Sequence, residues 1–245
     1  VAVPDAGAVG APDPAAGLGT ALACAAGGAG RVVLGGVGED GQLADRFPDL
    51  PVMPVEADFT KPVDLPILVR DMPRLGFFPG STIGNLDAAE AVDLLRSMHK
   101  TLGAGSHLLI GMDLIKDRAT LKAAYDDAAG VTAAFNLNLV HRINRELVGT
   151  IPANALCHVA RWNDKFARIE MHLEAVRDIA FEVSGRRFTM RKGETIHTET
   201  SHKYDLRCQS LLLGAGGWSI LRRWTDGAGR FSVLLAEATT APKAP

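Results

Sequence analysis

Residues 77 to 85 read FFPGSTIGN, and this stretch decides how the rest of the chain is interpreted. Its apolar, aromatic opening predicts a buried strand, its proline and glycines predict a turn, and a helix signal follows from Leu86. Ligands of open α/β sheets bind at the carboxyl ends of strands, where such a turn lies. The glycines let the backbone approach a ligand closely, and Asn85 adds a carboxamide at the rim. We therefore predict a ligand-binding loop.

The flanking segments predict a mainly parallel sheet. Apolar residues recur on one face of residues 87–102, which predicts an amphipathic helix, and residues 107–112 (HLLIGM) predict the next buried strand. Strand, helix and strand in this order imply parallel pairing with a right-handed crossover. The chain ends in a predicted hairpin, with strands over residues 218–224 and 230–238. A parallel sheet that finishes in an antiparallel hairpin indicates an α/β fold of the Rossmann-like class I methyltransferase type.

The pattern changes between residues 116 and 203. Two consecutive helices are predicted at 117–129 and 132–147, and strict alternation from Ile169 to Ala175 then predicts an antiparallel sheet. Residues 179–183 and 188–190, on either side of a turn at 184–185, repeat this alternation and are expected to continue the sheet. A further helix is predicted from Tyr204 to Leu213. We expect an inserted α+β substrate-binding domain over 116–203, and a methyltransferase (cofactor) domain over 1–115 and 204–245 that is incomplete at its N-terminus.

Composition narrows the class of protein. The chain has 245 residues, 47% of them hydrophobic, and a formal net charge of -2 without a basic run, so nucleic-acid binding is not expected. No apolar run approaches the length of a membrane span, so no membrane partner is expected. Three widely spaced cysteines favour a reduced, cytoplasmic location. The seven histidines do not cluster in the sequence, His197 and His202 being the closest pair, and no metal site is expected.

The first forty residues differ from the rest. They are mostly alanine, glycine, proline and valine, begin with Val1 rather than methionine, and lack a basic segment before an apolar core, so they do not predict a signal peptide. We interpret them as a truncated or altered amino-terminal region. A short strand over residues 31–34, between glycine turns, and glycine-rich disorder are both compatible with the next part of this region. The segment LPVMPV, residues 50–55, predicts a clearer strand.

Two residue pairs have side chains suited to ligand binding. Asp58 and Phe59 follow the strand of residues 50–55, where an acid and an aromatic ring can hold a flat heterocycle, although a turn aspartate beside a core phenylalanine fits equally. Glu199 and Ser201 share one face of an extended segment, with Thr200 on the other, and together can hold a nitrogen heterocycle. The alternative is that Ser201 caps the following helix and Glu199 is solvated.

Other residues are expected to be structural on spacing alone. Tyr125 lies on the apolar face of its helix, where packing is its default role, although its hydroxyl can also meet a ligand carboxylate. Met171 points inward along its strand and either packs in the core or lines an apolar pocket. His172 and His197 are expected to be solvated strand residues.

Several long motifs, in order and spacing, resemble one family. They are FFPGSTIGN, LLIGMDLIKD, AAYDDAAGVTAAFNLNLVHRINREL, RIEMHL and ETIHTETSHKY, and the likeness extends from about Gln42 to the C-terminus. The chain resembles the histidine-specific, S-adenosylmethionine-dependent N-alpha-methyltransferases, which trimethylate L-histidine to hercynine in ergothioneine biosynthesis. The resemblance implies S-adenosyl-L-methionine as cofactor, and L-histidine and its mono- and dimethylated forms as substrates.

The resemblance also implies roles for residues in the substrate half of the site. Asn85 would bind near the substrate's amino group, Tyr125 its carboxylate, and Glu199 and Ser201 the imidazole, with Thr200 between them and Met171 lining the pocket. The reaction, displacement at a sulfonium methyl by a neutral amine, demands alignment rather than a general base, so no catalytic residue is expected.

In the cofactor half, Asp58 and Phe59 would contact the adenine end. Gly80 and Ser81 would lie on the cofactor side of a junction lined by residues 79–84.

The chain departs from the family near its N-terminus. The family's glycine-rich first loop has no recognisable counterpart; Gly7 is near its expected place, and Glu39 and Asp40 are candidates for the acid that binds the ribose hydroxyls. Two alternatives therefore stay open. Beside methylation of L-histidine, these are a catalytically impaired member that cannot bind cofactor and a methyltransferase for another amino acid.

Overall fold

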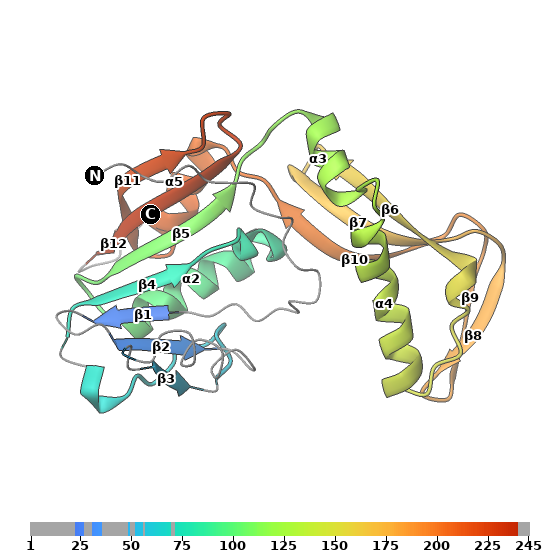
Figure 1. Ribbon diagram of the computed structural model, residues 1–245, viewed down its shortest axis with the longest axis horizontal. Coiled ribbons are helices and arrows are strands. Elements are labelled where there is room, and N and C mark those ends of the chain that lie inside the picture. The colour runs from blue at the N-terminus through green and yellow to red at the C-terminus, as the bar shows by residue number, and fades with distance from the viewer. Residues whose placement is uncertain are drawn as a thin grey trace.

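The computed structural model describes residues 23–26, 31–35, 49, 52–55, 57–69 and 72–239. Figure 1 shows two parts side by side: a larger part built on a twisted sheet, and a smaller part that holds the middle of the chain. The larger part contains β1 Ala23–Ala26, β2 Arg31–Gly35, β3 Val52–Val55, η1 Ile67–Val69, β4 Arg74–Phe78, η2 Thr82–Asn85, α2 Ala88–Leu102, β5 His107–Asp113, α5 Leu206–Ala215, β11 Trp218–Thr225 and β12 Phe231–Ala238.

The seven-stranded sheet confirms the predicted fold class. Its strand order is β11-β12-β5-β4-β1-β2-β3. The chain fills one side of β1 with β2 and β3 and then crosses to β4 and β5 on the other side, which creates a switch point between β1 and β4. β4 and β5 pair in parallel, as do β2 and β3, and β12 inserts antiparallel between β5 and β11. This is the predicted sheet with its terminal antiparallel hairpin.

β1 runs against both of its neighbours. It pairs antiparallel with β2 and with β4, and its last residue, Ala26, lies opposite Arg74 at the start of β4. Only four residues separate β1 from β2, whereas a crossover between parallel strands needs a dozen or more. The last residue of β1 therefore lies at the edge of the sheet away from residues 79–85. The short strand predicted at 31–34 is confirmed, and β1 was not predicted.

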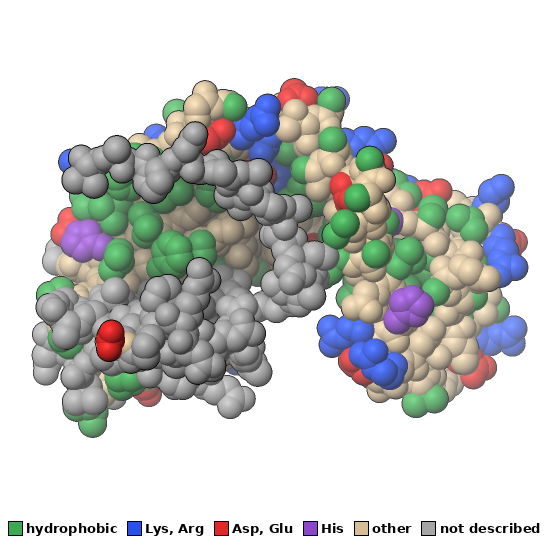
Figure 2. Space-filling view, viewed as in Figure 1, with side chains coloured by type: hydrophobic (Ala, Val, Ile, Leu, Met, Phe, Trp, Pro, Cys, Tyr) green, Lys and Arg blue, Asp and Glu red, His purple; other side chains and the backbone are tan. Residues whose placement is uncertain are grey.

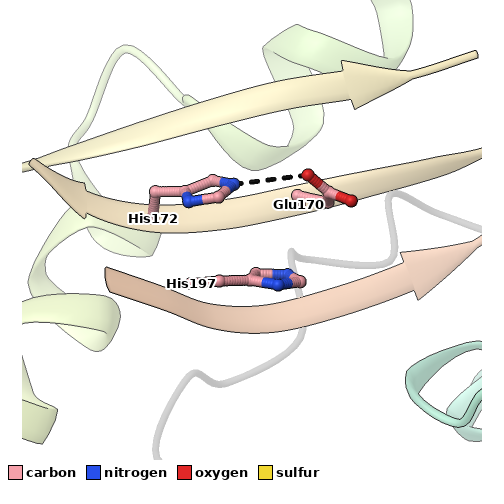
Figure 3. A group of neighbouring side chains, drawn as sticks. All are labelled: Glu170, His172 and His197. Atoms are coloured by element: carbon pink, nitrogen blue, oxygen red, sulfur yellow. Dashed lines mark hydrogen bonds and ion pairs between the residues drawn. The ribbon is translucent and has the colours of Figure 1, made fainter. Parts of the chain in front are cut away.

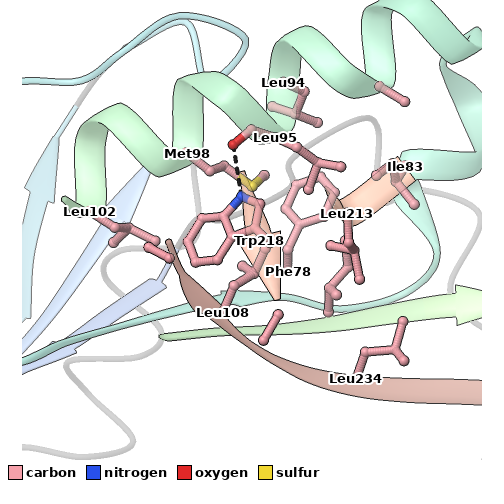
Figure 4. Close-up of a cluster of buried hydrophobic side chains, with 14 of the residues drawn as sticks. Phe78, Ile83, Leu94, Leu95, Met98, Leu102, Leu108, Leu213, Trp218 and Leu234 are labelled. Carbon is pink, nitrogen blue, oxygen red and sulfur yellow. Dashed lines mark hydrogen bonds between the residues drawn. The ribbon is translucent and has the colours of Figure 1, made fainter. Parts of the chain in front are cut away.

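Helix α2 anchors the core of the larger part. It begins with a capping box in which Asp87 Oδ1 accepts from Glu90 N and Glu90 Oε2 accepts from Asp87 N, both at 2.9 Å. Its apolar face packs on the sheet beside α5 (Figure 4), and the buried Trp218 donates its Nε1–H to the carbonyl of Leu95 at 2.9 Å. Gly216 allows the close approach here, because a Cβ on it would lie 2.4 Å from Leu95 Cβ.

The smaller part has its own two core clusters. Its elements are α3 Arg118–Tyr125, α4 Val131–Glu146, η3 Ala153–Ala155, β6 Leu156–Asn163, β7 Arg168–Ala175, β8 Ile179–Val183, β9 Arg186–Met190 and β10 Thr195–His202. β10, β7 and β6 form an antiparallel sheet in that order, and β8 and β9 form a separate two-stranded sheet. The apolar side chains of this part make clusters separate from that around α2. The predicted division at residues 116 and 203 stays a prediction, which these separate cores support.

The two connections between the parts run side by side. Leu114 and Tyr204 form a parallel bridge, in which Tyr204 N donates to Asp113 O at 2.9 Å and Ile115 N donates to Tyr204 O at 3.1 Å.

Figure 2 shows basic and acidic side chains next to one another over the outer end of the smaller part. Among the described residues, no helix is long and apolar enough to cross a membrane.

Several predicted elements need correction. The helix predicted from Tyr204 begins at Leu206, because Tyr204 is held in the bridge and Asp205 provides the cap. The helix predicted over 117–129 ends at Tyr125, since Asp127 turns to accept from the first backbone N–H groups of α4. β6 was missed, and β8 with β9 does not continue the sheet of β7.

A candidate substrate site between the two parts

The turn after β4 is held in an unusual backbone conformation. Gly80 has φ +75° and Ser81, buried beside it, has φ +58°, a left-handed conformation that costs energy for a residue with a side chain. Ser81 Oγ accepts from the backbone N–H of Asp113 at 2.8 Å, which ties the turn to the end of β5. Among the described residues, a Cβ on Gly80 would meet only Thr82 Oγ1, at 3.8 Å, so no other described atom crowds the space above Gly80. The predicted ligand loop thus lies at the carboxyl edge of the parallel strands.

The same turn also touches the smaller part. A Cβ on Gly84 would lie 2.9 Å from the backbone oxygen of His202, so Gly84 brings the turn against the end of β10. His202 Nδ1 lies 3.0 Å from Gly84 O, and the Tyr204 hydroxyl donates to Ile83 O at 3.2 Å. Gly84 therefore allows close packing against β10 rather than against a ligand. The next residue, Asn85, is half-buried.

A buried polar cluster joins α3, β10 and β5. The Tyr125 hydroxyl donates to Ser201 Oγ at 2.7 Å, and Lys203 Nζ donates to each of these two oxygens at 2.7 Å. The same ammonium pairs with Asp113 Oδ2 at 2.8 Å, while Lys116 pairs with Asp113 Oδ1 at 2.6 Å. Ser201 does not cap the next helix, so that alternative is wrong; Asp205 does, accepting from Cys208 N at 2.6 Å.

Glu199 lies on the same sheet face as Ser201 of this cluster, two residues along. It is opposite Met171 in the register of β10 and β7. Within the described part of the chain its carboxylate makes no hydrogen bond or ion pair, and burial raises the pKa of Glu199. Met171 is buried at 4% exposure. A half-buried acid with nothing to pair it is a candidate for ligand binding.

Thr200 points to the opposite face of the same sheet. There its Oγ1 lies 3.0 Å from His197 Nε2, away from Ser201 and Glu199. The role of Thr200 in substrate binding stays a prediction. In this arrangement only its backbone, and not its side chain, would contact a substrate beside Glu199 and Ser201.

On that opposite face the structure also gathers Glu170, His172 and His197 (Figure 3), so histidines far apart in sequence do meet. His172 is buried, at 8% exposure, so its prediction as a solvated residue is wrong, whereas His197 is exposed.

The geometry of these three residues does not favour a metal ion. The imidazole rings stack with centroids 4.8 Å apart and planes 19° apart. The lone pair of an imidazole nitrogen lies in the plane of its ring. The lone pairs of the two stacked rings therefore lie in two separate, nearly parallel planes and do not converge on one ion. Glu170 is also engaged, by Arg168 at 2.7 Å and by Asn163 Nδ2 at 2.9 Å.

Asp58 and Phe59 follow β3 at the same sheet edge as Ser81. The Asp58 carboxylate accepts from the Thr60 hydroxyl at 2.6 Å and pairs with Lys61 at 2.9 Å, and these contacts lower the pKa of Asp58 to about 2. Phe59 packs at the margin of the core, with its ring centroid 6.4 Å from that of Phe78. The observed arrangement matches the turn-aspartate interpretation, and the predicted contact with adenine stays a prediction.

The described residues fit an S-adenosylmethionine-type cofactor at one half of the sheet edge. The ends of β3, β4 and β5 bring Phe59, the open turn at Gly80 and Asp113 to the same edge. β1 does not fit, because it ends at the other edge of the sheet, and four residues between two antiparallel strands leave no room for the expected strand–glycine loop–helix order. Gly7, Glu39 and Asp40 lie outside the described residues.

A fold of the class I methyltransferase type, with a buried polar cluster at the carboxyl end of β5, defines the class of this protein. Residues 38–238 match the family model described as "Histidine-specific methyltransferase, SAM-dependent". The chain belongs to this family. The match begins after β1 and β2, the strands whose arrangement departs from the expected one.

Relatives with assigned names agree with the family. The histidine N-alpha-methyltransferase of Mycolicibacterium smegmatis is 40% identical over 200 residues, which cover 79% of this chain and 60% of that protein. The protein of the same name from Mycobacterium tuberculosis is 42% identical over 165 residues, covering 66% of this chain and 51% of that protein. The chain thus spans half to three-fifths of the length of these relatives.

Likeness to solved structures is weaker. An S-adenosylmethionine-dependent methyltransferase from Clostridium acetobutylicum has a TM-score of 0.44 and 10% identity, covering 84% of this chain and 74% of that one. A likeness at this level does not bear on function.

The sequence prediction missed the residues that connect the site, Lys203 and Asp113. Asp113 carried a usable signal, since it is an acid directly after the buried strand LLIGM, closer to its strand than Asp58 is to its own. Lys203 carried none, because one lysine at a strand end does not reveal its burial.

Proposed function

We propose that this chain transfers methyl groups from S-adenosyl-L-methionine to the alpha-amino nitrogen of L-histidine, giving the trimethylated product hercynine. Family membership supports the reaction class. The half-buried, unpaired carboxylate of Glu199, on one sheet face with Ser201, is the observation that carries the choice of substrate. A neutral imidazole has one N–H and one unprotonated nitrogen, and it therefore satisfies an acid and a hydroxyl side by side.

The substrate-facing residues would bind and orient the amino acid. Glu199 would accept the imidazole N–H, Ser201 would donate to the other ring nitrogen, and Met171 would line the pocket between them. The Asn85 amide oxygen would accept from the amino group and orient its lone pair away from the turn.

The Tyr125 hydroxyl donates a hydrogen bond to Ser201 in this arrangement. A bound substrate carboxylate would accept that hydrogen bond in place of Ser201. A ligand without these groups would leave buried polar atoms unpaired, which costs roughly 1–3 kcal/mol for each group.

The cofactor would supply an electron-poor methyl group when bound. Phe59, Gly80 and Ser81 are the described residues that would hold it, and Asp58 would lie near its adenine end. The chain's own contribution to the reaction is alignment and exclusion of water, in keeping with a reaction that demands no general base.

Incubation of the purified chain with L-histidine and S-adenosyl-L-methionine, followed by mass spectrometry, tests the activity. Mono-, di- and trimethylated histidine are expected, and a panel of other amino acids tests the alternative substrates. Methylation of another amino acid in preference to histidine would contradict the assignment.

Calorimetry tests the role of Glu199. Glu199→Ala should weaken L-histidine binding at least tenfold, since a hydrogen bond to a charged group is lost, while cofactor binding changes little. An equal loss for both ligands would reject the role in substrate binding.

The direction of β1 favours a second candidate: a member of the family that binds an amino acid but not the cofactor. Titration of S-adenosyl-L-methionine or its demethylated product into the chain separates the two. Saturable binding supports the methyltransferase, whereas histidine binding without cofactor binding supports the second candidate.

A further inference from the structure

Lys203 is a buried cation that the proposed reaction does not use. It lies just beyond β10, with 3% of the residue exposed. Its ammonium group makes three short contacts, to Asp113 Oδ2 at 2.8 Å and to the hydroxyl oxygens of Tyr125 and Ser201 at 2.7 Å each. An ammonium has three protons, so all of them are engaged. The ammonium also lies 4.7 Å from the centroid of the Tyr125 ring.

These contacts constrain where the two hydroxyl protons can point. An ammonium donates hydrogen bonds and cannot accept them, so each hydroxyl must accept from Lys203 and direct its own proton elsewhere. The Tyr125 proton goes to Ser201 Oγ. Ser201 then accepts two hydrogen bonds, and its remaining capacity is to donate. When a carboxylate accepts the hydrogen bond from Tyr125, Ser201 still accepts one from Lys203, and its own hydroxyl proton is still free to be donated to a ligand.

The ammonium is itself fixed from the larger part. Asp113 ends β5, and its backbone N–H donates to Ser81 Oγ in the turn after β4. A continuous chain of contacts therefore runs from Ser81 through Asp113 and Lys203 to the hydroxyls that face the substrate. The contacts with Lys203 join segments that are otherwise carried on separate sheets.

We propose that Lys203 is a positioning residue that turns the hydroxyl protons of Ser201 and Tyr125 toward the ligand. The site then selects an amino acid with hydrogen-bond acceptors at two places, an unprotonated ring nitrogen for Ser201 and a carboxylate for Tyr125. This inference rests on the proposed function and adds the group that sets the direction of its hydrogen bonds.

Titration of L-histidine into Lys203→Met tests the proposal, and Lys116→Met is the matched control. Lys116 pairs with the same carboxylate of Asp113 but makes no contact with either hydroxyl. Lys203→Met should weaken histidine binding about tenfold or more, and Lys116→Met less than about threefold. If Lys203→Met gives little folded protein, Lys203→Met combined with Asp113→Asn removes both charges and is measured in the same way.

Two further arms separate positioning from general damage. In a Ser201→Ala background, Lys203→Met should weaken histidine binding much less than it does alone, because the hydroxyl through which it acts is gone. Pyrrolylalanine, which has a ring N–H and no ring acceptor, should lose less affinity than histidine in Lys203→Met.

Equal losses for the two ligands, or full additivity with Ser201→Ala, would overturn the proposal. Histidine binding unaffected by Lys203→Met would overturn this inference alone. Absence of histidine binding to the unaltered chain would overturn the proposed function together with it.

Discussion

At the scale of single residues, the site is built from groups that are costly to bury. Ser81 adopts a left-handed backbone conformation, Glu199 is a half-buried acid that no described residue pairs with, and Lys203 is a buried cation. Each costs free energy that hydrophobic packing elsewhere must offset. The fold itself satisfies Ser81 and Lys203, whereas a ligand is expected to complete the hydrogen bonding of Glu199.

Glu199→Gln should stabilise the ligand-free protein at neutral pH and weaken its binding of histidine. Burial raises the pKa of Glu199, so the ionised form costs stability in the folded state. The gain is present above the folded pKa and vanishes as the pH falls below the unfolded value of about 4.3, where the acid is protonated in both states. Melting temperatures of both proteins from pH 8 to pH 4 measure it. A variant less stable than the parent at pH 8 would contradict the prediction.

At the scale of elements, close contacts between helices, strands and turns depend on particular glycines. Gly216 permits the contact of α5 with α2, and Gly84 permits the contact of the turn with β10. These contacts place the ends of β4, β5 and β10 near one another, which is what the candidate site requires.

Gly216→Ala should lower the free energy of unfolding by about 1–3 kcal/mol, since its Cβ would lie 2.4 Å from Leu95 Cβ. Gly214→Ala is the matched control, because Gly214 lies two residues earlier, within α5, and no described atom lies within 4 Å of a Cβ added to it. Alanine favours a helix over glycine, so this control should be neutral or more stable by up to about 1 kcal/mol. Urea unfolding measures both. Equal effects of the two changes would show that backbone preference, and not the contact with Leu95, decides.

At the scale of the whole molecule, stability should fall as the medium becomes acidic. Burial lowers the pKa of His172 and of His202. The unfolded chain therefore takes up protons first as the pH falls below about 6.5, and folding is progressively disfavoured down to the lower folded pKa values. His172→Gln should reduce the drop in melting temperature between pH 7.5 and pH 5.5. His141→Gln, a change at an exposed histidine, should leave the drop as it is; an unchanged drop in His172→Gln as well would contradict the prediction.

Much of the fold could be predicted from sequence because its signals are local. Helix α2, strand β5, the alternating strand β7 and the terminal hairpin lie within a few residues of their predicted bounds. Amphipathic periodicity, caps and turns are properties of a short segment, and they persist in the folded protein. β6 was not predicted, because its own sequence lacks a clear alternation. It forms a strand by pairing with β7 along its whole length.

The direction of β1 could not be predicted either. Parallel and antiparallel pairing of a short apolar strand have the same local pattern, and its orientation depends on the strands on both sides.

The sequence alone determined the sheet type, the ligand turn at residues 77–85 and, through resemblance, the candidate residues Asn85, Tyr125, Glu199 and Ser201. Only the tertiary structure decided which of these meet. Tyr125 and Ser201 are 76 residues apart in the chain, and Lys203 reaches Tyr125 across 78. Contacts of that kind form when separate elements pack, so the buried ammonium and the unpaired acid of Glu199 leave no trace in local sequence.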